Sequence, residues 1–153
     1  MKIIGLIVVL GLLVAGVGVG AADKQTEEIW LVTEGEAMLA SPPIARGTPD
    51  LPKNGPVIKI ERPALAPEIT TPFPVEVTFE PRPGGSPVKM DSLKVTYLKI
   101  IEVDVTDRFK PYIKDNRVIV EKANVPQGRH RLKILITDQN GNQTAEILQV
   151  NVK

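Results

Sequence analysis

The chain has 153 residues, a formal net charge of +1 and no cysteine. Its length suits one domain rather than two. The balanced charge offers no basic surface of the kind that releases counterions from nucleic acid, so we expect no nucleic-acid partner. The absence of cysteine excludes disulfide scaffolds, thiolate metal sites and thiol catalysis, as well as a lipid-anchoring cysteine.

Residues 1–22 have the three-part pattern of a secretory signal peptide. A single positive charge at Lys2 precedes an apolar run, residues 3–19, and small residues end the segment. We expect cleavage after Ala21 or Ala22, and hence a periplasmic or secreted protein of a bacterial envelope. The alternative is an uncleaved anchor, because a run of about twenty apolar residues can span a bilayer. Such a leader would be the protein's route to membrane contact.

Residues 23–56 are predicted to be an arm and linker outside the folded domain. Ser41–Pro56 contains five prolines and two glycines, which suit neither a helix nor a hydrogen-bonded strand. Residues 23–56 carry six acidic and three basic residues, whereas residues 57–153 carry twelve acidic and fifteen basic residues. Because salt screens exposed ion pairs, we expect a solvated arm rather than one held against the domain by charge.

A short apolar run within this arm is the candidate partner-docking segment, because it contains the single tryptophan of the chain. The run consists of Ile29, Trp30, Leu31 and Val32. The alternative is that these side chains pack on the protein's own domain, since aromatic anchors serve both purposes. Thr33 and Glu36 follow at the spacing of a capping box, which predicts a short helical turn.

Residues 57–153 have the pattern of a β domain, with apolar and polar residues alternating between turns. The expected strands are 57–61, 73–80, 93–97, 101–105, 117–121, 129–136 and 143–153. The alternation loses phase near Lys99 and near Ile147, where we expect a bend and a β-bulge. Residues 106–113 suit a helical turn that Thr106 caps. The predicted fold class is all-β, a seven-stranded antiparallel sandwich.

The last predicted hairpin carries a pattern of its own. Gly128–Ile134 begins with Gly-x-His and alternates, and Asp138–Asn142 then supplies the turn. This pattern resembles the last hairpin of bacterial immunoglobulin-like and cadherin-like extracellular modules. The resemblance implies an immunoglobulin-like sandwich over Val57–Lys153, and it is informative about fold rather than function. The cysteine pair of antibody-type domains is absent, so the core alone must hold the sandwich.

No residue cluster in the sequence supports catalysis. His130, the single histidine, lies on the apolar side of its strand, where a structural role with a ring nitrogen bonded to a backbone carbonyl is expected. The serines fall in turns or the linker, without the strand-turn-helix context of a nucleophile; they are Ser41, Ser86 and Ser92. We therefore predict a non-enzymatic protein that uses no cofactor.

Calcium is the one metal that the sequence brings into question. Oxygen ligands would come from two loops meeting at one end of the sandwich, with side chains of Asp104, Asp107, Asp138, Asn140 and Asn142. The Asp-x-Asn-x-Asn spacing lacks an acidic residue that would complete the shell. Asparagine and glycine at such positions equally suit a tight hairpin turn. We therefore predict no metal site.

A basic stripe on one strand is the candidate anion-binding site. It consists of Arg129, Arg131 and Lys133 on the outward face, and Lys94 would join it if its strand were the neighbour. The alternative is a solvated polar face that protects the sheet.

These features together predict an exported, non-enzymatic immunoglobulin-like module for protein binding or assembly, whose partner is another envelope protein. One alternative is a calcium-dependent adhesion module, which metal titration would distinguish. Another is a saccharide-binding accessory domain of an envelope enzyme. An enzyme itself would need a cleft with perturbed titrating groups, and no cluster in the sequence provides one.

Overall fold

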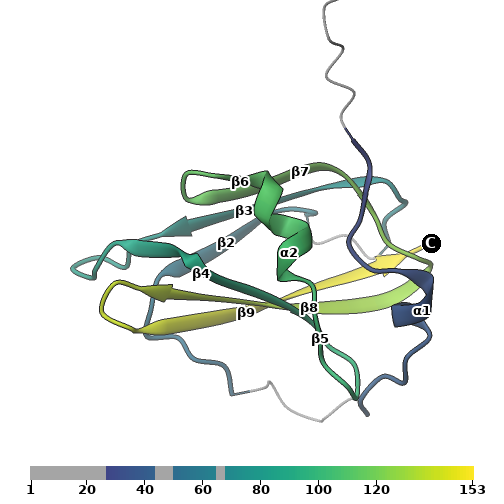
Figure 1. Ribbon diagram of the computed structural model, residues 1–153, viewed down its shortest axis with the longest axis horizontal. Helices are drawn as coiled ribbons and strands as arrows, with labels where there is room; N and C mark the ends of the chain where they lie inside the picture. The colour runs from purple at the N-terminus through teal and green to yellow at the C-terminus, as the bar shows by residue number, and fades with distance from the viewer. Residues whose placement is uncertain (1–26, 44–49, 65–67) are drawn as a thin grey trace, which may run out of the picture.

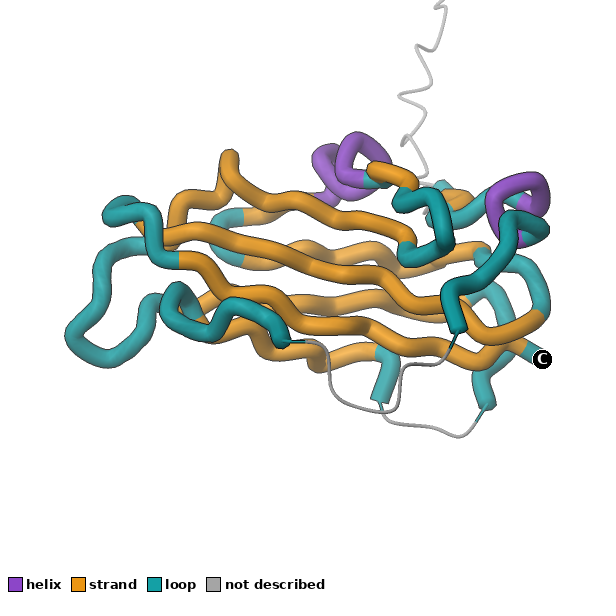
Figure 2. Tube along the Cα trace, turned by 90° about the horizontal axis from the view of Figure 1, so that it is seen from below, coloured by secondary structure: helices purple, strands orange, loops and turns teal. Residues whose placement is uncertain are grey.

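The structure is a computed structural model that describes residues 27–43, 50–64 and 68–153. The predicted signal peptide lies outside the described residues. The described strands form two sheets in a sandwich-like arrangement around a common apolar core (Figure 1). Figure 2 shows the long strands running along the length of the molecule, with short helical segments on its upper side. The prediction of an all-β protein with two sheets is thus confirmed.

The first sheet is built around two long strands and includes a short strand from the arm. Its order is β1 (Ile29–Trp30), β7 (Arg117–Asn124), β3 (Phe73–Glu80) and β2 (Val57–Arg62). A further short strand, β6 (Ile113–Lys114), also pairs with β7. β1 runs parallel to β7, whereas the other pairs are antiparallel.

The second sheet is antiparallel, with two long strands at its centre. Its order is β5 (Val103–Asp104), β4 (Val88–Tyr97), β8 (Gly128–Asp138) and β9 (Gln143–Val152). β2 and β9 are therefore edge strands, one in each sheet, and they lie against each other at one side of the sandwich.

The described helical segments are short. They are α1 (Glu34–Ala37), α2 (Thr106–Phe109) and the 3₁₀ turn η1 (Lys110–Tyr112). Both predicted helical turns are confirmed, and Thr33 and Glu36 form the expected capping box. Thr106 does not cap α2 as predicted, because its hydroxyl group donates to Asp104 Oδ1 at 2.5 Å and accepts from the Val95 amide at 2.9 Å.

The core follows the alternation of the sequence. Every second residue of β3 and β8 is buried: Phe73, Val75, Val77 and Phe79, and His130, Leu132, Ile134 and Ile136. The bulge expected near Ile147 is wrong, because the register of β8 with β9 runs unbroken from Gly128 opposite Val152 to Thr137 opposite Gln143. In this register Ala145 and Ile147 lie on the face opposite Leu148 and Val150, and another segment of the chain bonds to the edge of β9 at Ala145.

That segment is residues 52–55 of the predicted linker, which lie along the start of β9. The amides of Asn54 and Gly55 donate to the Gln143 carbonyl at 3.0 and 2.9 Å, and the Pro52 carbonyl accepts from the Ala145 amide at 2.9 Å. Proline lacks an N–H group but keeps its carbonyl, so a proline-rich segment still accepts sheet hydrogen bonds. The expectation that residues 41–56 stay outside the sheet is therefore corrected for residues 52–55.

Residues 29–32 of the arm are also part of the folded unit. Leu31 and Val32 are 0 % exposed and belong to the common core, and the Leu31 amide donates to the Asn124 carbonyl at 3.0 Å. Residues 57–153 therefore lack part of the core that the described chain builds. The predicted boundary at Pro56 therefore does not separate a folded domain from a linker.

Arg108 of α2 connects the arm to the sandwich. Its guanidinium donates to the Leu31 carbonyl at 2.7 Å and to both carboxylate oxygens of Glu36, at 2.8 and 2.6 Å. The hydrogen bond from Arg108 lowers the pKa of Glu36 to about 2. The expected solvated arm is therefore corrected: a partly buried, bidentate ion pair resists the screening that weakens exposed pairs.

Candidate functional site

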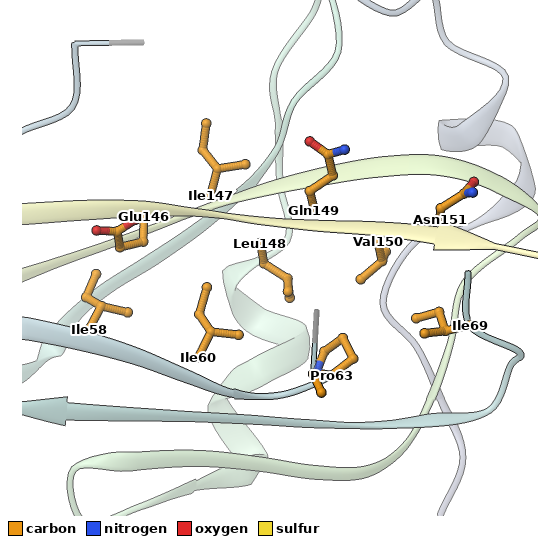
Figure 3. Close-up of a pocket in the computed structure, with 11 residues that line it drawn as sticks. Ile58, Ile60, Pro63, Ile69, Glu146, Ile147, Leu148, Gln149, Val150 and Asn151 are labelled. Atoms are coloured by element: carbon orange, nitrogen blue, oxygen red, sulfur yellow. The ribbon is translucent and has the colours of Figure 1, made fainter. Parts of the chain in front are cut away.

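An apolar groove lies between the edge strands of the two sheets, β2 and β9, and has a volume of about 420 Å³. We call it the edge groove. Its apolar lining comes from side chains that face one another across it in Figure 3: Ile58, Ile60, Leu148 and Val150. Glu146 adds a carboxylate to the same groove. The edge groove therefore suits apolar side chains over most of its length.

The backbone of β9 is only partly covered along this groove. At its start β9 bonds to residues 52–55, and at its end the Ile69 amide donates to the Asn151 carbonyl at 2.9 Å. Because outward amides alternate along a strand, those of Ile147 and Gln149 point to the same edge as the bonded amides of Ala145 and Lys153. Within residues 27–43, 50–64 and 68–153, no strand pairs with β9 between these two covered ends.

A second hollow lies on the outer face of the sheet that contains β9, and it has a volume of about 460 Å³. We call it the arginine pocket, and it is lined by Ser41, Pro42, Leu98, Arg129, Arg131 and Gln149. Among the described residues, neither arginine has a carboxylate within 4.0 Å. Alternation along β8 sets the two arginines on one face, about 7 Å apart along the strand. The pocket therefore offers two unpaired guanidinium groups to an anion.

The other members of the predicted basic stripe do not line this pocket. Lys133 Nζ is paired with Glu102 at 3.1 Å. Lys94 lies on β4, which is a neighbour of β8, but it pairs in register with Leu135 rather than with either arginine. The structure thus brings Arg129 and Arg131 together and separates them from the two lysines.

Lys99 adds a buried positive charge beside the arginine pocket. It is 7 % exposed, and its ammonium group donates to the Ala37 carbonyl at 2.8 Å and to Ser41 Oγ at 3.1 Å. Burial lowers the pKa of Lys99, and the Tyr97 ring lies 5.2 Å from Nζ. Ser41 lines the pocket, and because its Oγ accepts from Lys99, its hydroxyl hydrogen is available to donate to another group.

His130 has the structural role that its position predicted. It is 3 % exposed, its Nε2 lies 2.8 Å from the Pro126 carbonyl, and its Nδ1 lies 2.8 Å from the Tyr97 hydroxyl. A carbonyl only accepts, so Nε2 carries the hydrogen and neutral Nδ1 accepts from Tyr97. Burial lowers the pKa of His130 and raises the pKa of Tyr97 to about 12. Neither ring is arranged for proton transfer to a substrate.

This buried histidine predicts a loss of stability in acid. Its pKa is lower in the folded chain than in the unfolded chain, so the unfolded chain binds more protons below about pH 6.5. Urea unfolding should show stability falling from pH 7 to pH 5. His130→Gln should flatten that dependence while costing about 1 to 3 kcal/mol at pH 7, because Tyr97 loses its partner. An unchanged pH dependence in the variant would contradict this assignment.

The loops considered for calcium lie at opposite ends of β4. Asp138 pairs in register with Val88, whereas Asp104 pairs with Thr96. Both oxygens of Asp138 already accept hydrogen bonds within the turn, from the amides of Asn140 and Asn142 and from the Asn142 side chain, each at 2.9 Å. These contacts belong to a closed hairpin turn. Asp107 carries an exposed pair with Lys110. The structure therefore does not assemble the two-loop site.

The predicted docking run divides into buried and exposed residues. Leu31 and Val32 are in the core, which excludes them as partner contacts and corrects that expectation. Ile29 is partly buried against the same core. Trp30 is 52 % exposed and remains open to contact. Sequence reasoning missed the edge groove, since alternation marks Ile58 and Leu148 as inward-facing but does not show which edge is left uncovered.

Comparisons of the chain with known protein families, curated proteins and solved structures find no match. In the part of the chain that the structure describes, no helix has the length and apolar character needed to cross a membrane.

Proposed function

We propose that the protein is a non-enzymatic, exported immunoglobulin-like module that binds another envelope protein. Binding occurs when an extended segment of the partner adds to the uncovered part of β9. The leader pattern supports export, and the Gly-x-His hairpin supports the immunoglobulin-like assignment.

The observation that carries this proposal is the edge of β9 above an apolar groove, with which no described residue pairs between Ala145 and Asn151. Strand addition needs unpaired backbone amides for affinity and a pocket for alternate side chains for specificity. Ile147 and Gln149 supply the amides. The alternate residues Leu148 and Val150 face the groove. The other edge strand, β2, has Lys59 and Arg62 in ion pairs across to β3, an arrangement typical of a protected edge.

The test uses random peptides displayed on phage and selected against the purified protein. Binders should shift the nuclear magnetic resonance signals of the Ile147 and Gln149 amides and protect both from hydrogen exchange. Ile147→Pro should abolish binding, because it removes an outward donor while leaving the bonds to β8. Ile147→Thr keeps the amide and should still bind. Shifts confined to β2 or to another surface would contradict the proposal, as would full binding by a folded Ile147→Pro variant.

A further inference from the structure

Resting on the proposed function, we infer that the partner segment alternates apolar and acidic residues. Its apolar side chains enter the edge groove, and its acidic side chains bind Arg129 and Arg131 in the arginine pocket. The inference thus names the chemical class of the partner as an acidic, extended peptide.

The two sites are continuous through one residue. Gln149 of β9 lines both the edge groove and the arginine pocket, and it pairs in register with Arg131 of β8. A strand added outside β9 at Gln149 would lie two strand spacings from β8, or about 10 Å. An extended arginine and a glutamate or aspartate side chain together bridge that distance. Figure 3 shows Gln149 and Ile147 on the side of β9 away from Leu148 and Val150.

The charge of the arginine pocket determines which residue type is favoured at the outward positions of the partner segment. Arg129 and Arg131 have no carboxylate partner among the described residues, whereas the nearby Lys133 is already neutralised by Glu102. Ser41 also lines the pocket and adds a hydroxyl group, whose oxygen accepts from the buried ammonium group of Lys99 at 3.1 Å. Guanidinium groups bind carboxylates through paired, charge-assisted hydrogen bonds. An acidic side chain therefore gains contacts there that a neutral one lacks.

The inward positions of the segment have the opposite requirement. Ile58, Ile60, Leu148 and Val150 present hydrocarbon to the edge groove. Glu146 would repel a second carboxylate within the same groove. Because neighbouring residues of a strand face opposite sides, apolar and acidic residues must alternate in the bound segment.

The experiment compares the peptides selected by the protein with amide versions of themselves, in which each Asp becomes Asn and each Glu becomes Gln. We expect alternating apolar and acidic sequences, with affinity at least about tenfold weaker for the amide versions. Arg129→Gln combined with Arg131→Gln should weaken the acidic peptides by a similar factor and remove their preference. Lys89→Gln combined with Lys114→Gln removes the same charge from exposed lysines elsewhere and should leave the preference unchanged.

The outcomes separate this inference from the proposed function. If peptides bind at Ile147 and Gln149 but the double arginine variant keeps the same acidic preference, the inference fails and strand addition stands. If no selected peptide contacts β9, the proposed function fails. If acidic peptides still bind a folded Ile147→Pro variant at full affinity, the arginine pocket acts apart from the edge, which overturns the inference.

Discussion

Replacing Leu31 with alanine is expected to lower the free energy of unfolding by about 2 to 5 kcal/mol, because the change leaves a cavity in the core. Leu31 is 0 % exposed, and its backbone is held by Asn124 and Arg108. Urea unfolding followed by circular dichroism measures the effect. Trp30→Ala is the matched control on the adjacent residue: because Trp30 is 52 % exposed, its replacement should cost much less.

The same reasoning applies to removal of the whole arm. A chain that begins at Val57 lacks Leu31, Val32 and the residues that cover the start of β9, so we expect weak or non-cooperative unfolding. A truncated chain as stable as the full one, or a Leu31→Ala variant no weaker than Trp30→Ala, would show that the arm does not contribute to the core.

Replacing Gly55 with alanine is the second change with a large expected effect. A Cβ atom at this position would lie 2.4 Å from the Asn142 carbonyl oxygen and 2.7 Å from the Gln143 carbonyl carbon, both in the backbone. The segment must move away from β9, at a cost of about 1 to 3 kcal/mol. Faster hydrogen exchange of the Ala145 amide should accompany this loss, since that amide bonds to Pro52.

Gly35→Ala is the control for the Gly55 variant. A Cβ atom at Gly35 would meet nothing within 4 Å, and the residue lies in α1. Alanine favours a helix by up to about 1 kcal/mol over glycine, so this variant should be neutral or slightly more stable. A Gly55→Ala variant with unchanged Ala145 exchange would contradict the close packing of residues 52–55 on β9.

The long strands were predictable because their period-two pattern reports burial on one face. β3 was predicted at its observed bounds, and β8 and β9 were predicted within three residues of theirs. The predicted bulge in β9 was wrong, although the alternation of apolar residues does lose phase near Ile147. Ala145 is buried although it lies on the face opposite Leu148, and its amide bonds to Pro52, about ninety residues earlier; the local pattern does not show that such a distant segment lies beside it.

The docking of the arm and the site itself were harder to predict. A four-residue apolar run such as residues 29–32 has the same composition whether it enters its own core or binds a partner. The basic stripe on β8 was predicted from the sequence. The separation of Lys133 from the two arginines was not, because it depends on Glu102, which pairs with Lys133 across the sheet. The edge groove depends on which stretches of β9 other segments leave uncovered, and composition carries no such information.

The partial cover of β9 has a consequence for self-association. Edge strands with long unpaired backbones recruit further copies and grow into cross-β aggregates. Here the segment at residues 52–55 and the bridge at Ile69 cap both ends of the strand, and the stretch between them is short. A second β9 cannot align along its full length with such an interrupted edge. The same geometry that admits one extended segment thus limits fibril growth.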